Sequence, residues 1–362
     1  MKAAITAIAY ATGSNRVGLD EMRARFGTET ADKIAAMSGI LERRTVGADT
    51  CASDLAENAA RMLFGNALAS PESIDLLLFA TQTPDYAMPS NACIMQDRLG
   101  LGKSCAAFDI NLGCSQFPYA LATAGAWLEA SLARRALVIT ADTATRLIHP
   151  MDKSSVSLFG DAAAATIVEK SDDYIDFGFG TNGAGYADLI CPTSGMRNPP
   201  TPRDFEEYTD ADGNVRTNAN MKIDGFKIFA FAYKTIPQAV NELLKKNGMG
   251  VDDIDLFVFH QAGEMMVSAA ADRLKIPPEK VYFKMHDIGN CGGASVPIAL
   301  ADAAINGRLK AGMKVAVCAF GVGLSWGAAL LEWSGKFAGA KTSDDYSDSP
   351  EKPASQRRAD AK

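Results

Sequence analysis

The chain has 362 residues and a formal net charge of -7, and 48% of its residues are hydrophobic. This length and apolar content suffice for one large domain or two fused smaller ones. The acidic balance argues against nucleic-acid binding and against an anionic membrane surface as partners. The seven cysteines stand singly, so we expect neither disulfides nor a metal site, and we place the protein in a reducing cytoplasm.

The first apolar stretches predict a strand and a buried helix. Residues 1–13 are too short and too interrupted by polar residues for a signal peptide, and we interpret them as a first strand. No charged residue lies between Asp109 and Glu129, but this stretch begins with strand and turn residues and contains Pro118. The helix that follows is too short to cross a bilayer, so we expect no membrane span and a helix buried on all sides.

An internal repeat indicates two similar halves. SIDLLLFATQT at residues 73–83 is echoed by DIDLFVFHQAG at residues 253–263. Two further pairs follow in the same order: FDINLGCSQFPYAL with HDIGNCGGASVPIAL, and RRALVITAD with GMKVAVCAFG. Such apolar runs, alternating with helical patterns, are typical of buried strands in α/β proteins. We therefore predict an α/β fold built from two pseudo-symmetric halves.

Composition suggests where these halves begin and end. We place the first half at residues 1–171 and the second at residues 172–333. Within the second, residues 186–220 are rich in proline, glycine and acidic residues and lack an apolar period, which predicts an excursion loop. From Ser334 the chain has almost no large apolar residues, so we expect a disordered tail at residues 334–362.

Cys114 is the candidate nucleophile. It lies where the apolar strand AAFDI gives way to the uncharged helical stretch. A thiol at a helix N-terminus faces unpaired N–H groups and the helix dipole, which favour the thiolate. The alternative is a small, inert core residue, and we assign the other six cysteines to that class.

His260 and Asn290 are the candidate partners of this thiol. His260, one of three histidines, ends a buried strand, and Asn290 lies in the glycine-rich turn GNCGG. The repeat makes the Asn290 turn equivalent to the Cys114 segment, so we expect these residues to meet between the halves. A purely structural role for His260 remains the alternative. Gly321 and Gly323 could let backbone N–H groups approach a ligand as an oxyanion hole.

These motifs resemble the 3-oxoacyl-acyl carrier protein synthase III family of the thiolase superfamily. The resemblance covers nearly all of the chain up to Trp333. The motifs occur in family order: SGILERR, AMPSNACIMQDRLGL, FDINLGCSQFPYAL, SLFGDAAAA, FHQAG, GNCGGASVP and FGVGLSWGAALLEW. The resemblance implies a thiolase-like, five-layered αβαβα fold and a homodimer.

The resemblance also implies a role for each candidate residue. Cys114 is acylated by an acyl-CoA or an acyl carrier protein, and His260 with Asn290 stabilises the carbanion formed when a malonyl thioester loses carbon dioxide. The backbone amides of Cys114 and Gly323 hold the thioester oxyanion. CoA or phosphopantetheine thioesters are substrates, and no separate cofactor is implied. Covalent capture followed by attack is sound chemistry for a difficult condensation.

The departures from the family pattern concern substrate binding. Lys33 and Met37 stand where members that use acetyl-CoA have a tryptophan and an arginine around the nucleotide. Lys153 replaces the usual arginine before the FGD motif. Gly263 replaces the last asparagine of the HQAN motif, and Met265 replaces a basic residue that helps to dock the carrier protein.

The departures favour a specialised condensation over a housekeeping role in starting fatty acid synthesis. Met88 replaces the aromatic residue that the dimer partner contributes to the acyl pocket, and its flexible side chain could admit a different acyl group.

Our leading hypothesis is an acyltransferase that performs decarboxylative Claisen condensation to a 3-oxoacyl product. One alternative is acyl transfer from Cys114 to an alcohol or amine, with His260 as general base. Another is a non-catalytic partner subunit of a larger synthase.

Overall fold

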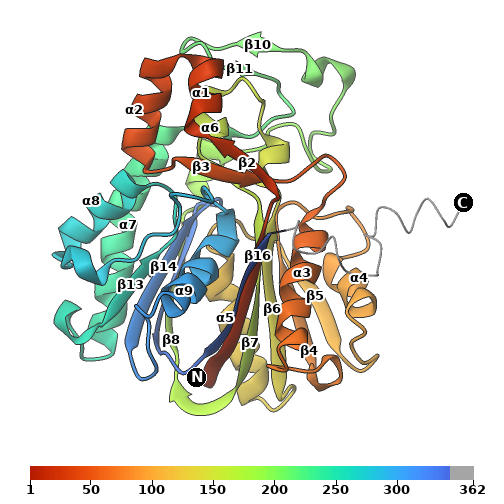
Figure 1. The fold of residues 1–362 in the computed structure, drawn as a ribbon, viewed down its shortest axis with the longest axis vertical. Coiled ribbons are helices and arrows are strands. Elements are labelled where there is room, and N and C mark those ends of the chain that lie inside the picture. Colours follow the sequence, from red (N-terminus) through yellow and green to blue (C-terminus); the bar gives the residue numbers. More distant parts are fainter. Residues whose placement is uncertain (343–362) are drawn as a thin grey trace, which may run out of the picture.

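The computed structural model describes residues 1–342 and contains two large sheets between three layers of helices, together with three two-stranded sheets (Figure 1). The first sheet has the strand order β16-β1-β7-β6-β4-β5. Its strands are β1 (Lys2–Thr12), β4 (Leu76–Ala80), β5 (Ala106–Ile110), β6 (Arg135–Asp142), β7 (Ala162–Tyr174) and β16 (Lys336–Thr342). The first strand expected at residues 1–13 is therefore present as β1.

The second sheet repeats the order of the first. It runs β13-β14-β15-β8. Its strands are β8 (Asp176–Thr181), β13 (Leu256–Phe259), β14 (Lys314–Gly321) and β15 (Ser325–Glu332). In each sheet a parallel pair, β4 with β6 or β13 with β14, is followed by two antiparallel pairings. The first sheet has two further parallel pairs, β4 with β5 and β1 with β16. The repeated sequences thus form equivalent strands, and the predicted thiolase-like architecture is confirmed.

Helices cover both faces of each sheet. The central layer contains α5 (Gln116–Glu129) and α9 (Ser295–Ile305). The outer layers contain α3 (Ala52–Gly65) and α4 (Asn91–Arg98) on the first sheet, and α7 (Gly225–Lys246) and α8 (Glu264–Leu274) on the second (Figure 1). As predicted, α5 is buried along most of its length. No helix within residues 1–342 is long and apolar enough to span a membrane.

The apolar runs explain this layering. All five residues of β4 are buried, and successive side chains point to opposite faces of the sheet. Leu76 and Leu78 join the core between the two sheets, whereas Leu77 and Phe79 pack in the core beneath α3 and α4. A strand that is apolar on both faces needs a layer on each side, which the central and outer helices provide.

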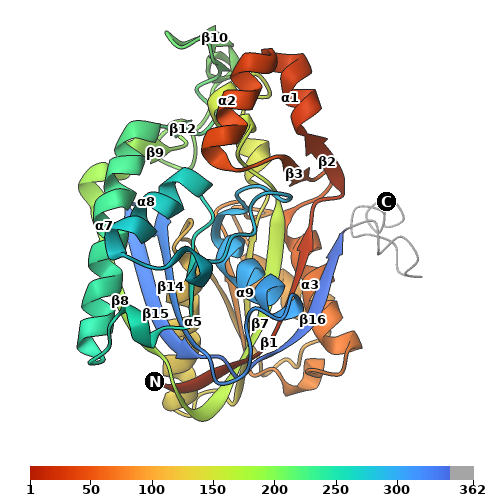
Figure 2. The same ribbon diagram turned by 60° about the vertical axis from the view of Figure 1, so that its left-hand side comes forward.

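Short elements lie over the upper ends of the sheets (Figures 1 and 2). These elements are β2 (Asn15–Gly18), α1 (Leu19–Phe26), α2 (Thr28–Ser38), β3 (Glu42–Thr45), α6 (Lys153–Val156), β9 (Leu189–Ile190), β10 (Tyr208–Thr209), β11 (Val215–Arg216) and β12 (Lys222–Ile223). Short 3-10 helices occur at Pro71–Ser73, Ala144–Leu147, Gly183–Asp188, Pro202–Phe205, Val251–Asp253, Pro278–Lys280 and Gly292–Ala294. Most of the short elements between residues 183 and 223 fall in the segment expected as an excursion loop.

Two boundaries differ from those expected. β7 continues to Tyr174, past the expected end of the first half at residue 171. The tail expected from Ser334 is a strand over Lys336–Thr342, because its backbone pairs in parallel with the open edge of β1. Composition alone could not reveal that partner. The remainder of the expected tail, residues 343–362, lies outside the described residues.

Candidate active site

Cys114 lies at the junction of β5 and α5 and faces the turn between β14 and β15. Its relative exposure is 9%. A Cβ on Gly321 would lie 2.9 Å from Sγ of Cys114, so only glycine fits beside the thiol without displacing it. Val322, which follows β14, also meets Cys114 through its backbone, and Gly323 is the next residue along the chain.

The protonation of the resting thiol differs from the expectation for a helix N-terminus. Burial, followed by the charge of Asp142, raises the pKa of Cys114 to about 12. Backbone hydrogen bonds of Val322 and of Cys114 itself act in the opposite direction but are outweighed. Cys114 is therefore a neutral thiol before substrate binds, and it must lose its proton during acylation.

His260 follows β13 and is held as a neutral imidazole. Its relative exposure is 2%, and burial lowers its pKa to about 3, although the backbone of Gly292 partly opposes this shift. Nδ1 lies 2.7 Å from Oγ of Ser295, and that oxygen accepts a hydrogen bond from the backbone N–H of Gln261. This arrangement favours a serine hydroxyl that donates to Nδ1 and an Nε2 that carries the ring proton.

Asn290 is presented by a turn that is pinned to the SLFGD segment. Its backbone N–H donates to Leu158 at 2.8 Å, and its carbonyl accepts from Gly160 at 3.0 Å. Its side-chain Oδ1 accepts from the backbone N–H of Gly292 at 3.0 Å. Within residues 1–342, Nδ2 of Asn290 has no hydrogen-bond partner and Nε2 of His260 has none among the side chains. The backbone of Gly292 lies within reach of the imidazole, and both nitrogens can donate to a ligand.

The backbone connects these three residues. The N–H of His260 donates to the carbonyl of Cys318 on β14, the strand that ends at Gly321 beside Cys114. Gly292 interacts with both His260 and Asn290. The structure therefore brings together the segments that carry the predicted thiol, imidazole and carboxamide.

Asp142 and Gln116 form a buried hub beneath this site that the sequence analysis missed. Oδ1 of Asp142 accepts from the backbone N–H of Gln82 at 2.8 Å and from the hydroxyls of Thr81 and Thr83. Oδ2 accepts from Nε2 of Gln116 at 2.9 Å. A Cβ on Gly293 would overlap the Gln116 amide, so the hub contacts both the start of α5 and the Asn290 turn. The only indication of this hub in the sequence is Gln116, a polar residue near the start of the uncharged helical stretch.

The Asp142→Asn variant should make the Cys114 thiol more acidic. The pKa of Asp142 is raised to about 6 by burial, so the group carries a negative charge above that pH. Removing this charge should lower the thiol pKa and speed alkylation by iodoacetamide at a fixed alkaline pH. The two alkylation rates should converge below about pH 6, where Asp142 becomes protonated.

The geometry of the hub permits this test. The new amide of Asp142→Asn can donate to Oε1 of Gln116, which is buried and has no partner within residues 1–342, once the Gln116 amide turns over. Unchanged alkylation rates across the pH range would contradict the electrostatic coupling between Asp142 and Cys114.

A pocket of about 340 Å³ lies beside Gly323 and Val322. Its other walls include Leu147, Leu189, Cys191 and Met221. This size falls in the range of small-molecule sites, and the lining is largely apolar. The pocket can therefore take an apolar group bound near Cys114.

The residues expected to bind substrate lie elsewhere. Met88 is 83% exposed on the surface of its own chain, and Nζ of Lys153 donates to the backbone carbonyl of Asp212 at 2.5 Å. Gly263 precedes α8 with φ +157°, a conformation that favours glycine. Met37 and Met265 are each 46% exposed. None of these residues lines the pocket.

Two equivalent α/β halves, with a cysteine at the start of one central helix, define a thiolase fold. The model of the 3-oxoacyl-[acyl-carrier-protein (ACP)] synthase III family matches residues 108–183, and that of its C-terminal part matches residues 244–333. The chain belongs to this family of acyltransferases, as its relatives and a solved structure also show.

Curated relatives cover most of the chain. A beta-ketoacyl-[acyl-carrier-protein] synthase III of Rhodopirellula baltica is 36% identical over 89% of this chain and 97% of its own. One from Caldanaerobacter subterraneus subsp. tengcongensis is 37% identical over 84% of this chain and 91% of its own. A crystal structure of a 3-oxoacyl-(acyl-carrier-protein) synthase III superposes with a TM-score of 0.90 at 37% identity, covering 92% of this chain and all of the other.

Proposed function

We propose that this protein joins an acyl thioester to a malonyl-type thioester by decarboxylative Claisen condensation. In the first step, Sγ of Cys114 loses its proton and attacks the acyl carbonyl. The acyl group passes to sulfur, and the donor thiol leaves with a proton. Backbone N–H groups of Cys114 and Gly323 are assigned to the developing oxyanion. The acyl chain occupies the 340 Å³ pocket beside Gly323.

In the second step, the malonyl thioester loses carbon dioxide and becomes an enolate. Nε2 of His260 and Nδ2 of Asn290 donate hydrogen bonds to the enolate oxygen. The enolate carbon then attacks the acyl carbonyl on Cys114, the carbon–carbon bond forms, and the thiolate leaves and regains a proton. The observation that carries this proposal is that Nε2 of His260 and Nδ2 of Asn290 bond no side chain, whereas hydrogen bonds occupy the other side-chain polar atom of each residue.

The protonation of His260 weighs against simple acyl transfer to an alcohol or amine. That reaction needs a general base, and a base is most effective when its pKa lies near the working pH. Burial lowers the pKa of His260 to about 3, which makes the imidazole a weak base. A neutral ring that donates from Nε2 suits an enolate instead.

A second copy of the chain is proposed to complete the pocket. Met88 is exposed, and the adjoining Asp85 is braced by the side chains of Ser53 at 2.6 Å and Asn91 at 3.1 Å. A braced loop that carries an exposed apolar side chain suits insertion into a partner. We assign Met88 to the acyl pocket of that partner in a homodimer. Lys153 and Gly263 are proposed to border the path of the CoA or carrier-bound thioester.

Intact-protein mass spectrometry tests the proposal. The protein is incubated with a panel of acyl-CoA and acyl-carrier thioesters, and malonyl-carrier is then added. We expect one acyl mass on the wild-type protein, discharge as a 3-oxoacyl product, and no adduct on Cys114→Ala. Cys191→Ala is the matched control, because Cys191 also lines the pocket and should not be needed. An adduct on Cys114→Ala, or an acyl-enzyme that malonyl-carrier does not discharge, would contradict the proposal.

A further inference from the structure

We propose that Arg216 fastens the segment 204–221 to the loop 147–154, and that this latch sets the size of the acyl group that the pocket accepts. The inference rests on the proposed function in one respect, the assignment of the pocket to the acyl chain. It makes Arg216 a positioning residue, because Arg216 itself does not line the pocket.

The latch is continuous with the pocket wall. Leu147 and Met221 both line the pocket, and the backbone N–H of Met221 donates to the carbonyl of Leu147 at 2.8 Å. The side chain of Asn220 donates to the same carbonyl, and its Oδ1 accepts from the N–H and hydroxyl of Thr217. Thr217 directly follows Arg216. A displacement of Arg216 is therefore transmitted within a few residues to Met221.

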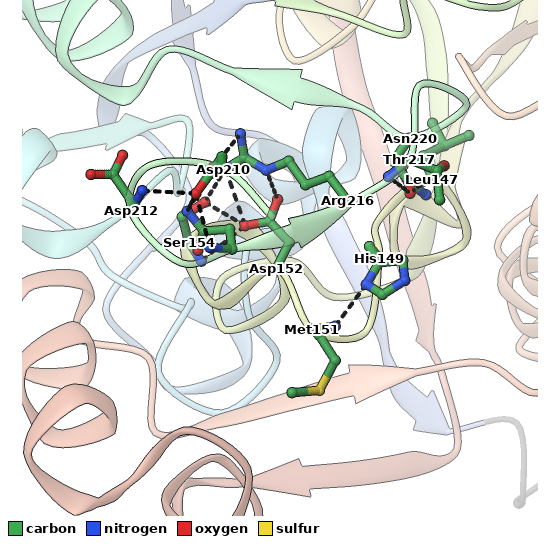
Figure 3. A network of polar contacts seen from close by, with 11 residues as sticks. Leu147, His149, Met151, Asp152, Ser154, Asp210, Asp212, Arg216, Thr217 and Asn220 are labelled. Carbon is green, nitrogen blue, oxygen red and sulfur yellow. Dashed lines mark hydrogen bonds and ion pairs between the residues drawn. The ribbon is translucent and has the colours of Figure 1, made fainter. Parts of the chain in front are cut away.

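Arg216 lies between two carboxylates (Figure 3). Its Nε and Nη2 donate to Asp152 at 3.0 and 3.2 Å, and Nη2 also donates to Ser154 at 2.9 Å. Its Nη1 lies 3.2 Å from Asp210. Asp152 is 1% exposed and caps α6 through the N–H of Ser154. A bidentate arginine on a buried carboxylate is a strong, directional contact.

Polar contacts hold this segment more than apolar burial does. Phe205 is 61% exposed and Tyr208 is 37% exposed. Besides the Arg216 contacts, Val215 donates to the backbone of Met151 and Lys153 donates to the backbone of Asp212. The four core clusters contain none of the residues from 204 to 220. Loss of Arg216 should therefore loosen residues 204–221 while both sheets stay folded.

The test compares Arg216→Met with Arg203→Met. Arg203 lies directly before this segment, is exposed, and has no side-chain hydrogen bond or ion pair to any described residue. For each variant, the rate of Cys114 acylation is measured with short, medium and long straight-chain acyl-CoA. We expect the ratio of long-chain to short-chain rates to rise roughly tenfold in Arg216→Met and to stay at the wild-type value in Arg203→Met. Arg216→Lys keeps the positive charge but loses the planar donor geometry of the guanidinium. Its ratio of long-chain to short-chain rates should lie between those of the wild-type protein and Arg216→Met.

Other readouts do not depend on the reaction. Hydrogen exchange across residues 204–221 should quicken in Arg216→Met, and labelling of the pocket residue Cys191 by bulky N-alkylmaleimides should speed up. If no donor acylates the wild-type protein but these two changes occur, the latch stands and the proposed function fails. The latch would be overturned if a folded Arg216→Met variant that is still acylated kept the wild-type ratio of long-chain to short-chain rates, even with all rates lowered equally. If Arg216→Met does not fold, Arg216→Lys decides by the same ratio.

Discussion

The His260→Ala variant is expected to stop condensation while leaving acylation of Cys114 in place. The imidazole is neutral, since burial lowers its pKa to about 3, and its Nε2 is the donor assigned to the enolate. Removing one donor of this kind costs roughly 100- to 1,000-fold in rate. Release of carbon dioxide from malonyl-carrier should fall by that factor, whereas the acyl mass on the protein should appear at nearly the wild-type rate.

Asn290→Ala should show the same division between the two steps. His286→Ala is the matched control, because that histidine pairs at 3.0 Å with Glu264 and its side chain is 44% exposed. It should change neither step. If His260→Ala slowed acylation as much as condensation, the imidazole would have to take the thiol proton of Cys114, and the assignment of His260 as a donor would be wrong.

Gly160→Ala is expected to disturb both stability and condensation. A Cβ at this position would overlap the carbonyl of Ile288 and lie 3.1 Å from that of Arg44, so backbone must move on both sides. Overpacking of this kind costs about 1–3 kcal/mol in the free energy of unfolding. Because the N–H of Gly160 also holds the carbonyl of Asn290, condensation should fall more than acylation. Thermal melting and the two separate rates measure these effects.

Gly178→Ala provides the comparison for this prediction. A Cβ on Gly178 in β8 would meet no other described atom within 4 Å, so its melting temperature and both rates should remain close to those of the wild-type protein. Equal acylation and condensation losses in Gly160→Ala would mean that the Asn290 turn does not transmit the displacement to the second step.

The sequence contained enough information for the architecture and for the residues assigned to the chemistry. Repeated apolar runs predict equivalent buried strands, and the pairing of β4 with β6 and of β13 with β14 follows that repeat. Cys114, His260 and Asn290 stand in short motifs with a recognisable order. Their roles remain predictions, because geometry shows what they can do and only kinetics shows what they do.

Features that depend on contacts between distant segments were not predictable. Asp142 at the end of β6 meets Gln116 at the start of α5, and Arg216 meets Asp152 across 64 residues of chain. The acidity of Cys114 was expected in the wrong direction, because a helix dipole can be inferred from local sequence but burial and a nearby carboxylate cannot. β16 was missed for the same reason, since its composition resembles a linker and only the open edge of β1 makes it a strand.

The place of β16 has a consequence for how the protein is made. The last described strand lies beside β1, so the sheet of the first half is completed by residues that leave the ribosome after the whole second half. Until then, the edge of β1 presents unpaired backbone groups to other chains. The first half is thus not a self-contained module. A chain shortened before Lys336 would keep its catalytic motifs but carry a permanently open edge prone to self-association.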